Sequence, residues 1–171
     1  MNGNAERLEI RLIDKEDSIS DLTSLLNRAY KRLADMGLKY VASWQDDEIT
    51  QKRIREVECW LGFLDGRLVA TVSLRDPRKG RGSDYYSRPD VASFNQFAVE
   101  PDLQGQGIGS RMLKHIEKRA IILGARELAF DTAEPAAHLI KYYENRGYRF
   151  IEIVDWEMTN YLSVIMSKYL L

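Results

Sequence analysis

Hydrophobic and polar positions along the chain follow two periods, and each period predicts a different kind of element. Apolar residues that recur every three to four positions predict helices with one buried face at residues 19–33, 108–123 and 136–147. A more polar stretch, residues 46–57, predicts a further helix. Alternating or short apolar runs predict strands, which fall at residues 8–13, 58–64, 68–74, 94–99, 127–130, 149–156 and 162–168.

Capping and turn residues mark the ends of these segments. Asp17 or Ser18 can cap the first helix, and Asp65-Gly66 is a strong hairpin signal between two strands. Gly124 is typical of a helix C-cap. The predicted order of elements is βααβββαβαββ. No linker is long enough to divide it, so we expect one domain over residues 1–171.

Composition narrows the possible functions. The 25 basic and 26 acidic residues give a net charge of −1, which argues against a dedicated nucleic-acid surface. The single cysteine, Cys59, lies in an apolar run, so we expect a buried thiol and a reducing compartment. No apolar run approaches the ~18 residues that span a bilayer, and residues 1–11 lack a signal core. We therefore expect a cytoplasmic protein without a membrane partner.

The most informative stretch lies where a strand runs through a turn into a helix. It is the glycine-rich sequence Gln104, Gly105, Gln106, Gly107, Ile108, Gly109 and Ser110. Three glycines at alternate positions let a ligand approach the backbone where a Cβ would collide. The first N–H groups of the following helix have no partner within the helix, and the helix dipole adds partial positive charge there. We therefore expect this segment to bind the phosphate groups of a cofactor.

Spacing separates three kinds of phosphate-binding loop. A dinucleotide fingerprint, G-x-G-x-x-G, requires a third glycine where this chain has Ser110. A nucleotide-triphosphate loop requires a lysine directly before the serine, and no lysine precedes Ser110. The third pattern, Q-x-x-G-x-G/A, fits Gln104, Gly107 and Gly109. It resembles the pyrophosphate loop of the GNAT superfamily of acetyl-CoA-dependent N-acetyltransferases.

A second motif supports this resemblance. Tyr143, Gly147 and Tyr148 resemble the family's Y-x-x-x-G-[FY] signature, and the likeness extends from about residue 8 to the end of the chain. The resemblance implies an α/β (α+β) GNAT fold, with a single mixed, mostly antiparallel sheet of about seven strands flanked by four helices. It also implies acetyl-CoA as cosubstrate, a small-molecule or peptide amine as acceptor, and a homodimer as one assembly that the family uses.

The resemblance also assigns roles to individual residues. The pantetheine arm of the coenzyme pairs with the backbone of Phe97, Ala98 and Val99. The N–H of Val99 is the expected donor to the oxyanion that develops on the thioester. Tyr143 is expected near the coenzyme sulfur, where its phenol is protonated at neutral pH and can donate a proton to the departing thiolate.

The general base is left open by the sequence. An alkylammonium with a pKa near 10.4 is almost entirely charged at pH 7, so a group must accept its proton. Asp131 occupies a position where some members of the family carry a glutamate that acts through water. Residues 131–135 equally suit a helix entry with Asp131 as cap. The amides of Asn95 and Gln96 can bind the acceptor or order a water, but they cannot act as bases.

Further expectations concern the surroundings of the reaction. The acceptor site is expected to form from three segments, residues 30–44, 75–90 and 156–161. Trp44, Trp156 and Tyr161 are expected to be exposed there. The coenzyme-contacting asparagine of many family members is replaced by Ala136. His115 is expected on a solvated helix face. No set of side chains has the spacing of metal ligands, so we expect no metal.

Three functional classes are compared on this basis. An N-acetyltransferase that moves an acetyl group from acetyl-CoA to a primary amine, by direct attack in a ternary complex, agrees with both motifs. A non-catalytic acyl-CoA-binding regulatory domain is the alternative, since the central strand has no carboxylate. A nucleotide-binding oxidoreductase conflicts with Ser110 and with the second motif. The sequence favours the acetyltransferase, with Tyr143 and Asp131 as its candidate catalytic residues.

Overall fold

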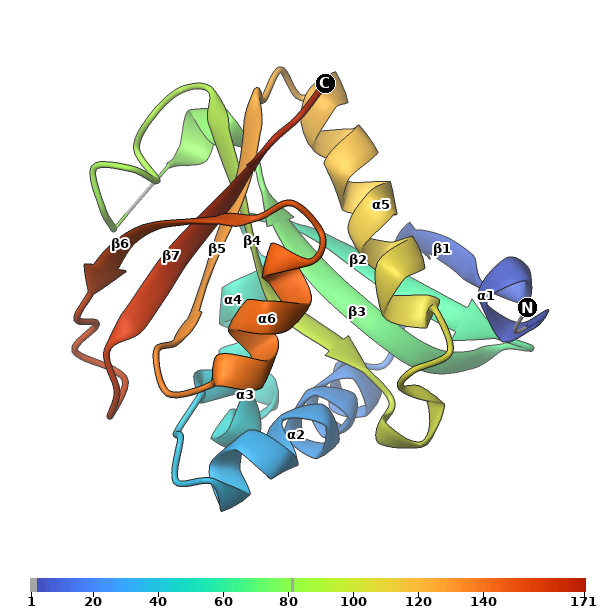
Figure 1. Ribbon diagram of the computed structural model, residues 1–171. Helices are drawn as coiled ribbons and strands as arrows, with labels where there is room; N and C mark the ends of the chain where they lie inside the picture. Colours follow the sequence, from blue (N-terminus) through green and yellow to red (C-terminus); the bar gives the residue numbers. More distant parts are fainter. Residues whose placement is uncertain (1–2, 81) are drawn as a thin grey trace.

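The computed structural model describes residues 3–80 and 82–171, which form one seven-stranded sheet with helices on both faces (Figure 1). The strands are β1 (Glu9–Leu12), β2 (Glu58–Leu64), β3 (Arg67–Arg75), β4 (Val91–Val99), β5 (Glu127–Ala133), β6 (Arg149–Val154) and β7 (Ser163–Tyr169). They lie in the order β1-β2-β3-β4-β5-β7-β6. Every neighbouring pair is antiparallel except β4 and β5, which are parallel. The mixed, mostly antiparallel α/β sheet that the sequence predicts is confirmed.

The described residues also form six α-helices. These are α1 (Gly3–Arg7), α2 (Ile19–Asp35), α3 (Val41–Trp44), α4 (Asp47–Ile54), α5 (Ile108–Ile122) and α6 (Ala137–Glu144). The four expected helices correspond to α2, α4, α5 and α6. The sequence does not predict α1 and α3, because their 5 and 4 residues are too short to reveal a hydrophobic period. In the described part of the chain, no helix is both long enough and apolar enough to cross a bilayer.

Helices α5 and α6 cover one face of the sheet, and α2 and α3 cover the other (Figure 1). One side of α5 is completely buried, and its residues pack in one cluster with Tyr143 of α6; they are Ile108, Met112, Ile116 and Ala120. Leu22 and Leu26 of α2 pack in another cluster with Cys59 of β2. Cys59 is therefore buried, as predicted, and this burial raises the pKa of its thiol.

The predicted ends of several elements are confirmed. The hydroxyl of Ser18 accepts a hydrogen bond of 3.1 Å from the N–H of Asp21 and so caps α2. Asp65 and Gly66 have φ angles of 48° and 80°, the left-handed pair that a tight hairpin between β2 and β3 requires. Gly124, with a φ of 91°, follows the last turn of α5.

β4 and β5 separate partway along their length. Their parallel ladder joins residues 91–93 to residues 127–129, and no further pair is formed among the described residues. Further along β4, Gln96 has a φ of 50° at the point where the register against β3 shifts. This is a β-bulge, which bends the strand and re-aims its backbone groups. The divergence of β4 and β5 is visible in Figure 1.

The predicted end of β5 is wrong in a way that affects the site. The strand does not stop at Asp131, because its pairing with β7 continues through Asp131 and Ile165 to Ala133 and Ser163. Helix α6 begins only at Ala137, and Ala136 precedes it without a side-chain cap. Asp131 therefore lies inside a strand, and the alternative that it caps a helix is excluded.

The predicted solvation of His115 is also wrong. Its ring packs edge-on against Trp60 of β2, with 4.3 Å between the ring centroids. Within the described residues, the buried Nε2 atom of His115 has no hydrogen-bond partner. Burial lowers the pKa of this imidazole below its ordinary value of 6.5.

Candidate active site

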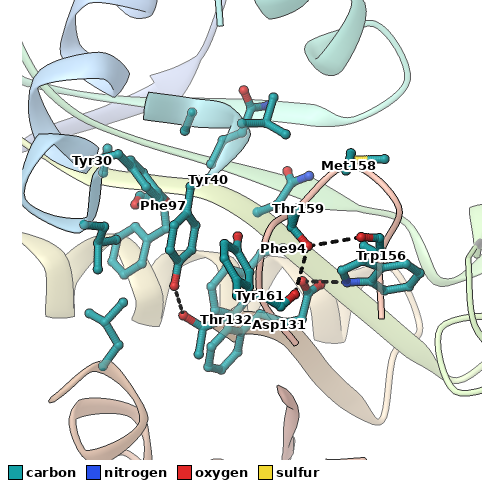
Figure 2. A pocket seen from close by; sticks show the side chains of 18 of the residues that line it. Tyr30, Tyr40, Phe94, Phe97, Asp131, Thr132, Trp156, Met158, Thr159 and Tyr161 are labelled. Atoms are coloured by element: carbon teal, nitrogen blue, oxygen red, sulfur yellow. Dashed lines mark hydrogen bonds between the residues drawn. The ribbon is translucent and has the colours of Figure 1, made fainter. Parts of the chain in front are cut away.

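A cavity of about 680 Å³ opens where β4 and β5 diverge. Its walls include residues from all three segments that the sequence predicts around the acceptor, among them Tyr30, Tyr86 and Tyr161. Figure 2 shows Tyr30 and Tyr161 around one space with labelled residues of β4 and β5. The end of β4 and the start of the glycine-rich segment, at Val99 and Gln104, lie at the same cavity.

The backbone of β4 faces this cavity. Tyr30 donates its hydroxyl hydrogen to the carbonyl of Phe97 at 3.0 Å, and the side-chain amide of Gln104 donates to the carbonyl of Val99 at 3.3 Å. Ala98 pairs with Thr71 of β3 on the opposite edge. Because alternate residues of a strand direct their backbone groups to the same edge, the N–H of Val99 points to the side of the Phe97 carbonyl. The three β4 residues predicted to bind the coenzyme all line the cavity.

The glycine-rich segment forms an open turn at the start of α5. Gly105 and Gly107 have φ angles of 77° and 85°, a left-handed conformation that disfavours other residues. Gly107 is the N-cap of α5 and provides no side-chain hydrogen bond to the first turn. A Cβ on Gly109 would lie 3.3 Å from the hydroxyl of Tyr142 and 3.5 Å from the ring of Phe97. The segment fits a phosphate group, since uncapped amides and bare glycines coincide there.

Arg146 adds positive charge beside this turn, which the sequence does not predict. Its guanidinium carbon lies 3.5 Å from the centroid of the Tyr142 ring. One terminal nitrogen donates to the hydroxyl of Ser110 at 3.2 Å, and the other donates to the carbonyl of Tyr142 at 2.9 Å. Stacking and hydrogen bonding thus hold a guanidinium next to the first turn of α5.

Tyr143 is almost fully buried, with 8% of its surface exposed, and it lines the cavity. Its ring packs against Phe130 of β5, with 4.0 Å between the centroids. In the described part of the chain, its hydroxyl makes no hydrogen bond. Burial raises the pKa of Tyr143 well above 10, so the phenol is protonated at every working pH. The side chain can therefore act only as a proton donor in this range.

Asp131 projects into the cavity from β5. One carboxylate oxygen accepts a hydrogen bond of 2.7 Å from the hydroxyl of Tyr86, and the other accepts one of 3.0 Å from the indole N–H of Trp156. Figure 2 shows the second of these bonds. Both donors come from segments far from β5 in the sequence. Together they fix the orientation of the carboxylate.

Three tyrosines form an aromatic wall of the same cavity. Tyr40 lies between Tyr30 and Tyr161, with ring centroids 5.4 Å and 4.9 Å apart, respectively. The hydroxyl of Tyr40 accepts a hydrogen bond of 2.9 Å from the N–H of Ala133. Burial raises the pKa of each tyrosine, so the wall is neutral. Trp44 was expected here, but it is 54% exposed and does not line the cavity.

A buried polar network supports the bulge of β4. The side-chain amide of Gln45 is 1% exposed and donates to the Oε1 atom of Gln96 at 3.1 Å. Gln96 donates in turn to the hydroxyl of Ser73 at 3.3 Å. Gln45 also accepts a hydrogen bond of 2.6 Å from Arg53 of α4, which lines the cavity. The side chain of Gln96 therefore stabilises the bulge of β4. No cluster of three or more candidate metal ligands occurs among the described residues.

Known proteins resemble this chain over most of its length. Residues 20–148 match the Acetyltransferase (GNAT) family. An S-(2-succino)cysteine N-acetyltransferase of Bacillus subtilis (strain 168) is 33% identical over 135 residues, which are 78% of this chain and 79% of that protein. An S-alkylcysteine N-acetyltransferase of the same organism is 27% identical over 165 residues, which are 94% of this chain and 88% of that protein.

Solved structures share the fold at lower identity. A GNAT family acetyltransferase from Elizabethkingia anophelis with acetyl-CoA bound has a TM-score of 0.70 and 16% identity, and the match covers 96% of this chain and 99% of that one. A putative acetyltransferase from Salmonella typhimurium with its cofactor acetyl-CoA has a TM-score of 0.69 and 19% identity, with 95% and 94% covered. At such identities the likeness concerns the fold alone.

Proposed function

The chain belongs to the acetyltransferase (GNAT) family and is an acyl-CoA-dependent N-acetyltransferase, and we propose that its acceptor is the α-amine of an S-substituted cysteine. One observation carries the proposal. A single cavity joins the segment suited to the coenzyme with an aromatic wall and a fixed carboxylate suited to an amino acid. Both relatives described above are named for S-substituted cysteines, which supports this class of acceptor.

Acetyl-CoA, as cosubstrate, would be held by two groups of residues. The amides of residues 104–110, with Arg146 beside Ser110, would bind the diphosphate. The backbone of residues 97–99 would pair with the pantetheine arm. These residues line the cavity, and they lie beyond the end of the ladder between β4 and β5, so β5 does not pair with them. The remaining volume, between Tyr30 and Trp156, is left for the acceptor.

The reaction is a direct transfer within the ternary complex. The acceptor nitrogen attacks the thioester carbon, so a C–N bond forms while the C–S bond breaks. The N–H of Val99 would stabilise the negative charge on the thioester oxygen, and one such donor contributes about 3 kcal/mol. Tyr143 would donate its proton to the departing sulfur, so that free coenzyme A leaves as a thiol. The second proton, which the nitrogen loses as the amide forms, would restore the phenol of Tyr143 through solvent.

The proton of the acceptor needs a separate base. We assign this role to Asp131, acting directly or through one water, because its carboxylate is oriented into the cavity by Tyr86 and Trp156. The proton lost from the amine then reaches solvent through Asp131. Asn95 and Gln96 have no such role.

The aromatic wall suits the sulfur substituent of the acceptor. Tyr30, Tyr40 and Tyr161 are neutral and half-buried or more, so they offer apolar surface to an alkyl or aryl thioether. A sulfur atom also contacts aromatic rings favourably, by about 0.3–1.5 kcal/mol.

The test is acceptor-dependent release of coenzyme A, followed with a thiol-reactive dye. S-substituted cysteines have no free thiol, so they do not react with the dye themselves. We expect turnover with S-methyl- and S-benzyl-L-cysteine, and at least about tenfold lower kcat/KM with putrescine. Stabilisation by acetyl-CoA without thiol release from any amine would instead indicate a regulator that binds without turnover.

A further inference from the structure

We propose that Arg53 binds the α-carboxylate of the acceptor, so that the enzyme acetylates free amino acids and discriminates against their amides. The proposal rests on the acetyl transfer to an amino acid proposed above. It assigns a specificity-determining residue on α4, an element that neither sequence motif includes.

Arg53 belongs to the same cavity as the reacting groups. It lines the space together with Tyr30, Tyr143 and Tyr161. Burial raises the pKa of both Tyr30 and Tyr161. The positive charge of Arg53 lowers the pKa of each phenol, and the negative charge of Asp131 raises it further. The two charges therefore act on the same pair of phenols. A cation and a carboxylate around one aromatic wall match the two charges of a zwitterionic amino acid.

One hydrogen bond joins the guanidinium to a neutral side chain. One of its terminal nitrogens donates to Oε1 of Gln45 at 2.6 Å. Gln45 is itself fixed, because it is 1% exposed and donates to Thr50 at 2.8 Å. This contact helps to orient Arg53, and the amide of Gln45 itself brings no opposite charge. An oriented guanidinium is suited to a carboxylate, which it can bind through two parallel hydrogen bonds.

Arg53 is also connected to the strand where the transfer takes place. Gln45 joins it to Gln96 through a hydrogen bond of 3.1 Å, and Gln96 immediately precedes Phe97 on β4. In an α-amino acid, only one carbon separates the amine from the carboxylate. A group that binds the carboxylate must therefore lie near the thioester, and Arg53 is two hydrogen bonds from β4. Long acceptors with a distant carboxylate do not need this arrangement.

The first experiment uses the wild-type enzyme alone. We compare kcat/KM for S-benzyl-L-cysteine and S-benzyl-L-cysteinamide at saturating acetyl-CoA. Because the amide is the weaker base, its neutral fraction is larger at pH 7, so pH-independent values from full pH profiles are compared. We expect the acid to be preferred by about 100-fold, since a hydrogen-bonded charge is lost with the amide.

The second experiment changes the charge on α4. Arg53→Met should reduce the preference for the acid from about 100-fold to less than about threefold, and Arg53→Lys should keep part of it. Arg55→Met is the matched control, because Arg55 is exposed at the end of the same helix and does not line the cavity. It should keep the wild-type preference. The Kd for acetyl-CoA and the unfolding temperature of each variant show whether the β4 bulge is intact.

Each outcome decides a separate point. Equal acetylation of acid and amide by the wild-type enzyme would overturn the role of Arg53 while leaving the acetyltransferase assignment intact. A loss of the same size for both acceptors in Arg53→Met, with weaker acetyl-CoA binding, would also overturn it, because that result indicates support of β4 through Gln45. Absence of turnover with the acid, the amide and S-methyl-L-cysteine alike would overturn the proposed acceptor class, and Arg53's role with it.

Discussion

Replacing Tyr143 with phenylalanine removes one oxygen atom from a side chain that lines the cavity. The structure predicts a small effect on folding, because the hydroxyl makes no hydrogen bond within the described residues and the ring keeps its contact with Phe130 at 4.0 Å. We therefore expect the free energy of unfolding to change by less than about 0.5 kcal/mol. Tyr30→Phe is the reference, since it loses the hydrogen bond to the Phe97 carbonyl and should cost about 1 kcal/mol.

The effect of Tyr143→Phe on the rate should be much larger. General acid catalysis contributes about 10²- to 10⁴-fold, which corresponds to about 2.7–5.4 kcal/mol of transition-state stabilisation. The pH dependence follows from burial, which raises the pKa of Tyr143 well above 10. Ionisation of this phenol therefore cannot reduce the wild-type kcat below about pH 10. The variant should be slow at every pH in this range.

The assay follows coenzyme A release at saturating acetyl-CoA and acceptor, from about pH 6 to pH 10. Urea unfolding of the same preparations gives the stability difference. A kcat within threefold of wild type across the whole pH range would refute the acid role of Tyr143. A large fall in both rate and stability would refute the claim that the hydroxyl has no structural partner.

Three further changes have defined outcomes. Gly107→Ala strains a left-handed residue by about 1–2 kcal/mol and brings a methyl group within 3.3 Å of Ala5, so the Kd for acetyl-CoA in calorimetry should rise about tenfold. Asp131→Asn should move the half-maximal pH of kcat upward toward the pKa of the amine, whereas Trp156→Phe, which keeps the carboxylate but removes one hydrogen-bond donor to it, should produce a smaller upward shift. Burial lowers the pKa of His115 below 6.5, so the unfolded chain takes up the proton first and stability falls as the pH drops below about 6.5. Urea titrations should show this loss in the wild type and a flatter profile in His115→Gln.

The parts of the site that the sequence predicts are formed by neighbours along the chain. Residues 104–110 are contiguous, and the glycines and the helix that follow them determine the shape of the turn locally. The buried face of α5 also follows from spacing, because a period of 3.6 residues places Ile108, Met112 and Ile116 on one side. The functional role of Val99 lies in its backbone, so the type of its side chain reveals nothing about it.

Other parts of the site depend on contacts between distant segments. Arg53 sits in a polar helix, where it is indistinguishable from a solvated charge until Gln45 and the cavity are placed beside it. His115 has the spacing of an exposed residue on α5, but Trp60 of β2 packs against its ring. The length of β5 depends on β7, so residues 131–135 resembled a helix entry. Such tertiary contacts override local propensity.

Because β4 and β5 separate, the free energy of unfolding of the protein should depend on whether acetyl-CoA is bound. A sheet split along one seam loses cross-strand bonds there, and a ligand arm lying against residues 97–99 would replace them. Bound ligand stabilises the folded chain by RT ln(1 + [L]/Kd), about 2.7 kcal/mol at one hundred times Kd. Without acetyl-CoA, a larger fraction of this enzyme would therefore be unfolded than at saturating acetyl-CoA.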